Sequence, residues 1–339
     1  MNESICVVLI TYRDNFQAYI TIVNTLESAL HLNITFLIAC GNTNPEHMVK
    51  ILSLVEHYKS RGTDVRVIFE ESIPLRLKWA VRNEHQWFIM LSDDDPFTTN
   101  YIGNYVKKIR DQSVDLRHVS NITPKVYVLT GKDSLDFFYP NSLTSIDPIG
   151  RIVSLLSSSN IGVRYYSAFR AEAVRKVFAE RIFFPSYVDQ LICLEAAKLG
   201  KSISFDGDGT VFYDLSNWLT PRQCLVSDLK YYKSPISIFF HEAYWLRDCL
   251  ESISELVLSL EGFSFIKAYS TTRLSNSLQN FPIRSAHLKE IGDLDAEIET
   301  KIFTRLIEIY QGIAKSHSFK ELSENLKPPI SAIERLDHY

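Results

Sequence analysis

Three adjacent aspartates, Asp93, Asp94 and Asp95, follow the apolar run of residues 87–91 after a single serine. Neighbouring carboxylates repel one another, so a compensating partner is expected where they converge. A hard divalent cation is one such partner, because Mg²⁺ and Mn²⁺ prefer oxygen ligands and can bridge carboxylates to a diphosphate. The alternative is a solvated acidic turn in which Asp93 or Asp95 caps the next helix. The elements around the triplet have to distinguish these two interpretations.

A second group of reactive side chains follows the apolar run of residues 5–10. Thr11 offers a hydroxyl, Tyr12 a flat ring that suits a nucleotide base, and Arg13 a cation that suits a phosphate. The alternative is an ordinary surface loop. The position after a buried strand favours a ligand-binding role for the three residues.

The first half of the chain alternates apolar runs with segments of helical periodicity. Apolar and β-branched runs predict strands at residues 5–10, 34–40, 64–69 and 87–91. Helical spacing predicts helices at residues 16–32, 46–60 and 75–83. This alternation predicts an α/β fold with an open, mostly parallel, Rossmann-like sheet. Ligands bind outside the carboxyl ends of the strands in such sheets, which is where both groups of side chains lie.

The remaining chain changes character near residue 220. Before it we expect a strand at residues 125–130 and a turn-rich insertion at residues 133–151. We then expect two helices, at residues 171–179 and at residues 189–199 before Gly200, and two short strands, at residues 203–205 and 210–213. After it the patterns are helical, at residues 236–260, 286–316 and 319–325. The sequence therefore predicts an α/β domain over residues 1–220 and a mainly helical region over residues 221–339.

Composition excludes several classes of protein. Hydrophobic residues make up 46% of the chain and charged residues 22%, so collagen-like and wholly disordered chains are excluded. A net charge of -4 argues against nucleic acid as the partner. The 5 cysteines form no CxxC pair, which argues against a zinc cluster and indicates a reducing, cytoplasmic setting. No stretch resembles a signal peptide or a membrane span, although peripheral contact with the inner face of a membrane stays open.

Residues 5–218 resemble the nucleotide-binding half of family 2 inverting glycosyltransferases, which have the GT-A fold. The strand that ends in Thr11 and Tyr12, and the segment WFIMLSDDD over residues 87–95, carry the resemblance. It implies transfer of a sugar from a nucleotide-sugar donor, which we expect to be a UDP-sugar, to a hydroxyl of a glycan or lipid-linked glycan. It also implies inversion, assistance by Mn²⁺ or Mg²⁺, and a role in bacterial surface polysaccharide biosynthesis.

The resemblance assigns the donor site residue by residue. Nucleotide-sugar binding falls to Thr11, Tyr12, Arg13, Asn42, Arg76, Asp93 and Asp94. Asn42 stands in the family's Asp-rich turn, and Arg76 aligns with the Arg of the family's ARN segment. Ser92 occupies the place of the first Asp of the family's DxD motif. Two alternatives therefore stay open, in which Asp93 and Asp95 form the pair or Asp94 and Asp95 hold the metal.

The resemblance also supplies a candidate general base and a further metal ligand. Asp189 opens a predicted helix, and a Gly-Lys turn, a short strand and Tyr213 follow in the family's order. Asp189 is the implied base, with an acid that complements the helix dipole as the alternative. Asp214 stands near the position of a histidine that the family often carries; it is a candidate metal ligand or a turn acid.

Other functions are kept beside this one. Residues 221–339 would shape the acceptor side, form a homo-oligomer or dock on a membrane, and the sequence does not choose among them. A GT-A-like binding or scaffold protein without activity is one alternative, motivated by Ser92 and by the altered turn at Asn42. A sugar-phosphate nucleotidyltransferase is another, although the first strand lacks the Gly-rich phosphate loop which that chemistry predicts.

Overall fold

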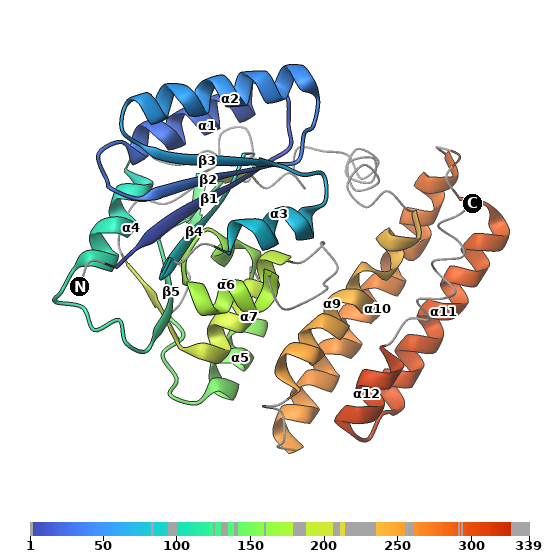
Figure 1. The fold of residues 1–339 in the computed structure, drawn as a ribbon. Helices are drawn as coiled ribbons and strands as arrows, with labels where there is room; N and C mark the ends of the chain where they lie inside the picture. The colour runs from blue at the N-terminus through green and yellow to red at the C-terminus, as the bar shows by residue number, and fades with distance from the viewer. Residues whose placement is uncertain are drawn as a thin grey trace. The chain divides into compact units, whose positions relative to one another are not determined.

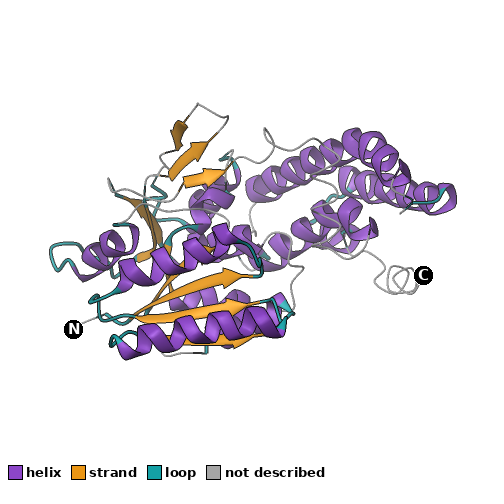
Figure 2. Ribbon diagram, turned by 90° about the horizontal axis from the view of Figure 1, so that it is seen from above, coloured by secondary structure: helices purple, strands orange, loops and turns teal. Residues whose placement is uncertain are grey.

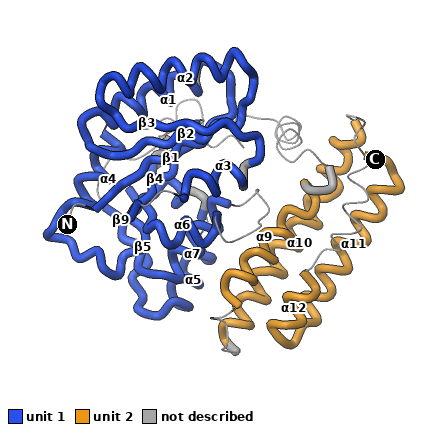
Figure 3. The backbone as a smooth tube through the Cα atoms, viewed as in Figure 1, with its two compact units in different colours: residues 1–214 blue, residues 215–339 orange. Residues whose placement is uncertain are grey.

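The chain divides into two compact units, Met1–Asp214 and Leu215–Tyr339 (Figure 3). The structure is a computed structural model. It describes residues 3–82, 85–93, 100–124, 126–129, 135–138, 142–158, 161–178, 188–205, 211–213, 235–254, 256, 260–290, 292 and 294–326.

A seven-stranded sheet organises the first unit (Figure 1). Its strand order is β3-β2-β1-β4-β8-β5-β9. The strands are β1 (Ile5–Thr11), β2 (Thr35–Cys40), β3 (Asp64–Phe69), β4 (Trp87–Ser92), β5 (Val119–Thr123), β8 (Ala168–Arg170) and β9 (Lys201–Ser204). Neighbouring strands are parallel except at β8, which runs antiparallel to both β4 and β5. The predicted mostly parallel α/β sheet is confirmed.

Helices cover both faces of this sheet (Figures 1 and 2). They are α1 (Phe16–Ala29), α2 (Pro45–Ser60), α3 (Ile73–Ala80), α4 (Tyr101–Arg110), α5 (Pro148–Leu156), α6 (Ala171–Phe178) and α7 (Val188–Leu199), with a 3-10 turn at Gly162–Tyr165. A smaller sheet has the order β10-β6-β7, formed by Val211–Tyr213, Val126–Leu129 and Leu135–Phe138.

Strand β1 shows how the pattern builds the core. Ile5, Val7 and Leu9 belong to one apolar cluster with Ile22 and Leu26 of α1. The intervening residues of the strand are just as buried but lie outside that cluster. Alternate side chains of a strand point to opposite faces, so both faces of β1 are covered, as its continuous apolar sequence predicts.

The early elements match their predictions to within a few residues, and the middle of the chain departs from them. The predicted turn-rich insertion at 133–151 is wrong, because it contains β7 and the start of α5. We also did not predict α4, β5 or β8. Strand β5 reads VSNIT, and its buried Ser120 and Asn121 break the apolar run that signals a strand. Strand β8 has only 3 residues, too few to show a period.

Gly200 follows α7 as expected, for a reason the sequence did not reveal. A Cβ atom there would lie 2.8 Å from the carbonyl oxygen of His118. Glycine is needed because β5 and the end of α7 approach closely, and no left-handed backbone is recorded at this residue.

The second unit consists of helices α9 (Pro235–Ile253), α10 (Leu260–Glu290), α11 (Ala296–Lys315) and α12 (Phe319–Asn325). The predicted helical region is confirmed, but we did not predict a helix over residues 261–285, which belong to α10, and the helical pattern at 286–316 covers the end of α10 and all of α11. Gly292 lies between α10 and α11 with a φ of +80°, and Asp295 caps α11 by accepting a hydrogen bond from the Ile298 N–H. No helix in the part of the chain that the structure describes combines the length and apolarity that a bilayer crossing requires.

A partly buried ion pair joins α9 to α10. The Arg273 guanidinium donates hydrogen bonds to Glu242 at 2.6 and 3.0 Å, and His241 lies 3.4 Å from the same carboxylate. Burial raises the pKa of Glu242, but the hydrogen bonds from His241 and Arg273 outweigh it and lower the pKa to about 2. The carboxylate therefore stays ionised within the bundle.

Replacing Ile89 by alanine tests the central packing of the first unit. Ile89 of β4 is fully buried, so Ile89→Ala should lower the free energy of unfolding by about 3 kcal/mol through lost burial and a residual cavity. Urea denaturation measures this change. Ile146→Ala removes the same atoms from a side chain that is 88% exposed and should have little effect. Equal losses in the two variants would contradict the described core.

Candidate functional site

Strands β1, β2 and β4 end together at one edge of the main sheet. In the parallel register Thr11 lies opposite Cys40, and Ile10 lies opposite Ser92. The segments that follow these strands therefore meet at the same place. Among the described residues, the structure thus brings the predicted Thr11, Tyr12, Arg13, Asn42 and Asp93 to this edge.

The Asp93 carboxylate is the centre of this edge. Its Oδ2 accepts hydrogen bonds from the Thr11 hydroxyl at 2.6 Å and from the N–H groups of Tyr12 and Arg13, each at 3.2 Å. Its Oδ1 lies 3.1 Å from the Arg13 guanidinium. Only 1% of Asp93 is exposed. The carboxylate therefore fixes the path of the chain after β1, because a buried charge needs such partners.

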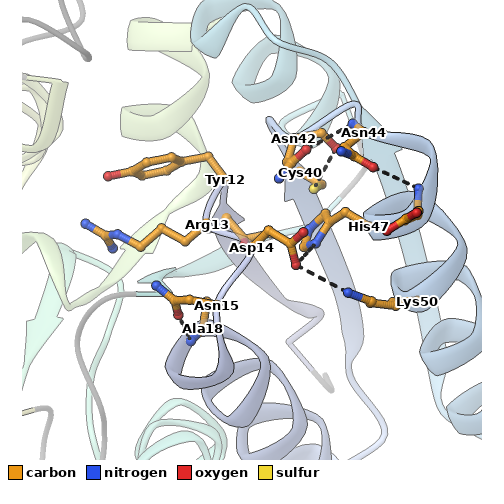
Figure 4. A network of polar contacts seen from close by, with 12 residues as sticks. Tyr12, Arg13, Asp14, Asn15, Ala18, Cys40, Asn42, Asn44, His47 and Lys50 are labelled. Carbon is orange, nitrogen blue, oxygen red and sulfur yellow. Dashed lines mark hydrogen bonds and ion pairs between the residues drawn. The ribbon is translucent and has the colours of Figure 1, made fainter.

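Tyr12 and Arg13 extend from the fixed loop toward the same side (Figure 4). The Tyr12 ring is 46% exposed, and the Arg13 guanidinium carbon lies 4.7 Å from its centroid. This stacking of a cation on an aromatic ring holds both side chains in one orientation. The loop therefore presents a flat aromatic surface beside a positive charge.

Arg76 reaches the same edge from α3. The side chain is 2% exposed, and its Nη1 donates to the carbonyl oxygen of Thr11 at 3.3 Å. A Cβ atom on Gly41, just after β2, would lie 1.6 Å from that Nη1. Any other residue at position 41 would displace the guanidinium. We did not predict Gly41 as a site residue, although its place in the turn after a buried strand was a usable signal.

Asn42 shapes the turn after β2. Its Oδ1 accepts a hydrogen bond from the Asn44 N–H at 2.9 Å, and the Asn44 side chain in turn caps α2 by accepting from the Glu46 N–H. The Cys40 thiol donates to the Asn42 carbonyl oxygen at 3.5 Å. Asn42 therefore lies at the predicted edge, with its side-chain oxygen engaged in an Asx turn.

Asp14 links the loop after β1 to α2 and was not predicted. Its Oδ1 lies 3.2 Å from Nδ1 of His47 and 3.7 Å from Nζ of Lys50 (Figure 4). The hydrogen bond with His47, followed by the charge of Lys50, lowers the pKa of Asp14. Asp14 and His47 are 33 positions apart in the sequence, a separation that gave no spacing signal for this contact.

Asp189 lies in the first turn of α7, which packs against α5, α6 and the 3-10 turn at Gly162–Tyr165. Burial raises the pKa of its carboxyl to about 6, although N–H groups of Gln190 and Asp189 itself act in the opposite direction. A carboxyl with this pKa is suited to proton transfer near neutral pH.

The predicted metal ligands Asp94, Asp95 and Asp214 lie outside the described residues. Within the described ranges no group of three or more His, Cys, Asp or Glu side chains is arranged to hold a metal ion. Asp93 is described, and four contacts to the loop after β1 occupy its oxygens.

No protein-family model matches the chain, and no curated protein matches its sequence. Solved structures do match it. The structure of S. aureus TarS 1-349 in complex with UDP-GlcNAc is 14% identical, covering 98% of this chain and 92% of that chain with a TM-score of 0.54. The same protein in complex with UDP is 12% identical over 98% and 91%, with a TM-score of 0.51. The mannosyltransferase PcManGT from Pyrobaculum calidifontis, in complex with GDP-Man and Mn²⁺, is 11% identical over 99% and 88%, with a TM-score of 0.49.

The two TarS structures show the fold of this chain. Together with the strand order and the helical second unit, they confirm the predicted GT-A fold. Fold alone does not fix an activity, so the function has to be argued from the site.

Asp93→Asn tests whether this carboxylate holds the site together. The substitution keeps the shape of the side chain but removes the charge that pairs with Arg13 and places an amide where a carboxylate oxygen accepted hydrogen bonds. We expect the free energy of unfolding to fall by about 2–4 kcal/mol, measured by urea denaturation. The matched control is Asp115→Asn, which breaks an exposed pair with Arg117 and should change little. If the Asp93 variant were as stable as the control, the Asp93 carboxylate would not be what holds the loop after β1 in place.

Proposed function

We propose that this chain is a glycosyltransferase that moves a sugar from a nucleotide-sugar donor to a hydroxyl of a glycan or lipid-linked glycan. One observation carries the proposal. The Asp93 carboxylate and the Arg76 guanidinium both bind the chain at Thr11, so that a flat ring and a cation are held at the carboxyl edge of a GT-A sheet. This edge is where open α/β sheets bind nucleotides.

The donor's nucleotide would occupy the loop after β1. The exposed face of Tyr12 suits stacking with a base, and the adjacent Arg13 suits a diphosphate oxygen. Arg76 and Asn42 would line the same site from α3 and from the turn after β2. Among the nucleotides we favour a uridine diphosphate, in keeping with the sequence resemblance.

A divalent cation, Mn²⁺ or Mg²⁺, would be held by Asp94 and Asp95, with Asp214 as a further candidate ligand. Carboxylate oxygens are the donor set that these hard cations prefer, and Asp94 and Asp95 directly follow Asp93 in the sequence. When bound, the cation neutralises charge on the departing diphosphate. Because the Asp93 carboxylate already accepts hydrogen bonds from Thr11 and Arg13, the pair Asp94 and Asp95 is the better-supported of the two predicted alternatives.

Asp189 would act as the general base of an inverting transfer. Its carboxylate takes the proton of the acceptor hydroxyl while the hydroxyl oxygen attacks the anomeric carbon, and the bond from that carbon to the diphosphate breaks. The nucleoside diphosphate leaves with the electron pair of that bond. A pKa of about 6 leaves Asp189 ionised at neutral pH yet more basic than an ordinary aspartate.

The acceptor and the biological setting rest on the sequence resemblance. A surface polysaccharide pathway supplies acceptors of the expected chemistry, and the helical unit would shape the acceptor side, form an oligomer or contact a membrane. These roles, and the assignment of catalysis to residues 1–220, stay predictions.

Nucleotide binding tests the donor site. We expect the native chain to bind UDP or a UDP-sugar more tightly with Mn²⁺ than without it, in titration calorimetry with UDP, GDP, dTDP and their sugars. Asp94→Ala/Asp95→Ala should weaken binding in the presence of Mn²⁺ at least tenfold, because the ligands of the bridging cation are removed. Asp111→Ala/Asp115→Ala removes two exposed aspartates elsewhere and should bind as the native chain does.

Other results of this experiment would favour the alternatives. Absence of binding to every nucleotide, with and without Mn²⁺, would overturn the donor site and favour a scaffold protein. Release of pyrophosphate from a nucleoside triphosphate and a sugar phosphate would instead identify a nucleotidyltransferase. Release of a nucleoside diphosphate, dependent on an acceptor, supports transfer.

The pH dependence of transfer tests Asp189. Because the base must be ionised, kcat should rise with pH through about 6 and level off above it. Asp189→Asn should lower kcat by about 10²–10⁴-fold while donor binding is unchanged. Glu172→Gln, a first-turn acid of α6, is the matched control and should keep the native profile.

A second measurement on the same variants does not depend on finding an acceptor. The folded state binds the Asp189 proton more tightly than the unfolded chain does, so this residue should lower stability as pH rises from about 4 to 6. Asp189→Asn should remove that decline, worth on the order of 2 kcal/mol, in urea denaturation across this range. Parallel pH profiles in the native chain and this variant would show that the pKa of Asp189 is not raised.

A further inference from the structure

A cavity of about 630 Å³ lies between the N-terminal parts of α1 and α2. Its lining includes Asp14, Phe16, Tyr19, His47, Val49 and Lys50. Tyr12 and Arg13 extend from one side of the loop after β1, whereas Asp14 extends from the other side toward α2 (Figure 4). The cavity is therefore separate from the surface that Tyr12 and Arg13 present, and its volume lies within the range typical of small-molecule sites.

Part of the lining is apolar and exposed. Phe16 is 79% exposed, Val49 65% and Tyr19 39%. These side chains contribute little to the core of the unit, and they come from two helices to border one hollow. Two aromatic rings at a concave surface offer an apolar platform that loses water when a ligand with an apolar face covers it.

The polar part of the lining is balanced in charge. The Asp14 carboxylate and the Lys50 ammonium lie 3.7 Å apart and offer an acceptor and a donor with no net charge. The His47 ring is 4% exposed, and its Nδ1 lies 3.2 Å from Oδ1 of Asp14, so it positions that carboxylate at the cavity.

We infer that this cavity is a second ligand site that binds a neutral carbohydrate unit. The C–H faces of a pyranose ring are apolar and match Phe16 and Tyr19, while its hydroxyl groups both donate and accept hydrogen bonds and match Asp14 and Lys50. A phosphorylated ligand would meet the Asp14 carboxylate, and a purely apolar ligand would leave the charged pair dehydrated. The inference stands on the cavity alone and does not require the proposed transfer activity.

Saturation-transfer NMR on the full chain tests this site, with the methyl glycosides of glucose, galactose, mannose and N-acetylglucosamine as probes. We expect transfer to the ring protons of at least one glycoside, and a Kd in the millimolar range. Phe16→Ala and Lys50→Met should each raise that Kd fivefold or more. Ile283→Ala changes an exposed apolar residue outside the cavity and Lys107→Met an exposed lysine outside it, and both should leave the Kd unchanged.

Three results would overturn the inference: no transfer to any of the four glycosides, a Kd that is unchanged in both cavity variants, or displacement of the glycoside by UDP with Mn²⁺. Phe16 and Lys50 are exposed, so both variants should keep the native melting temperature. If a variant lost glycoside binding only because it had unfolded, that loss would also count against the site. Glycoside binding without nucleotide binding would support this site and reject the proposed function.

Discussion

A single buried carboxylate determines how the functional edge is arranged. Asp93 sits at the end of the central strand β4, where its charge cannot be solvated by bulk water, and the chain after β1 supplies the compensating donors. Because two of these donors are backbone N–H groups, the interaction fixes the main chain and not only a side chain. The outward direction of Tyr12 and Arg13, and the opposite direction of Asp14, both follow from that fixed path.

A second constraint acts on the same loop from helix α3. Arg76 donates to the Thr11 carbonyl oxygen, and only glycine at position 41 leaves room for its guanidinium. Thr11 is thus held through its hydroxyl by Asp93 and through its carbonyl by Arg76. The buried Asp93 carboxylate and the buried Arg76 guanidinium both bind the last residue of β1, so the site is supported by strand β4 and helix α3.

The sequence predicted this fold where one physical signal dominates. Strands buried on both faces are continuous apolar runs, so β1, β2 and β4 were predictable, whereas β5 carries Ser120 and Asn121 inside the core and was not. The edge strand β3 is only partly buried, and its β-branched residues Val65, Val67 and Ile68 gave the signal. The edge cluster was predictable because parallel strands bring their carboxyl ends together. The Asp14–His47 contact and the role of Gly41 depend on the packing of α2 and α3 against their neighbours, which spacing along the chain does not encode. In the second unit, helical periodicity revealed the class of structure but not the break at Gly292.

The antiparallel strand β8 has a consequence for how the chain is synthesised. Strands β1 to β4 can pair as soon as residue 92 has emerged, but the outer edge of β4 finds its partner only when β8 follows at Ala168–Arg170. Until then a long apolar strand presents unpaired N–H and C=O groups, which is the kind of edge that other chains can join. The nascent protein is therefore most exposed to aggregation while roughly the second quarter of its sequence is being translated, and a truncation before residue 168 would make that vulnerability permanent.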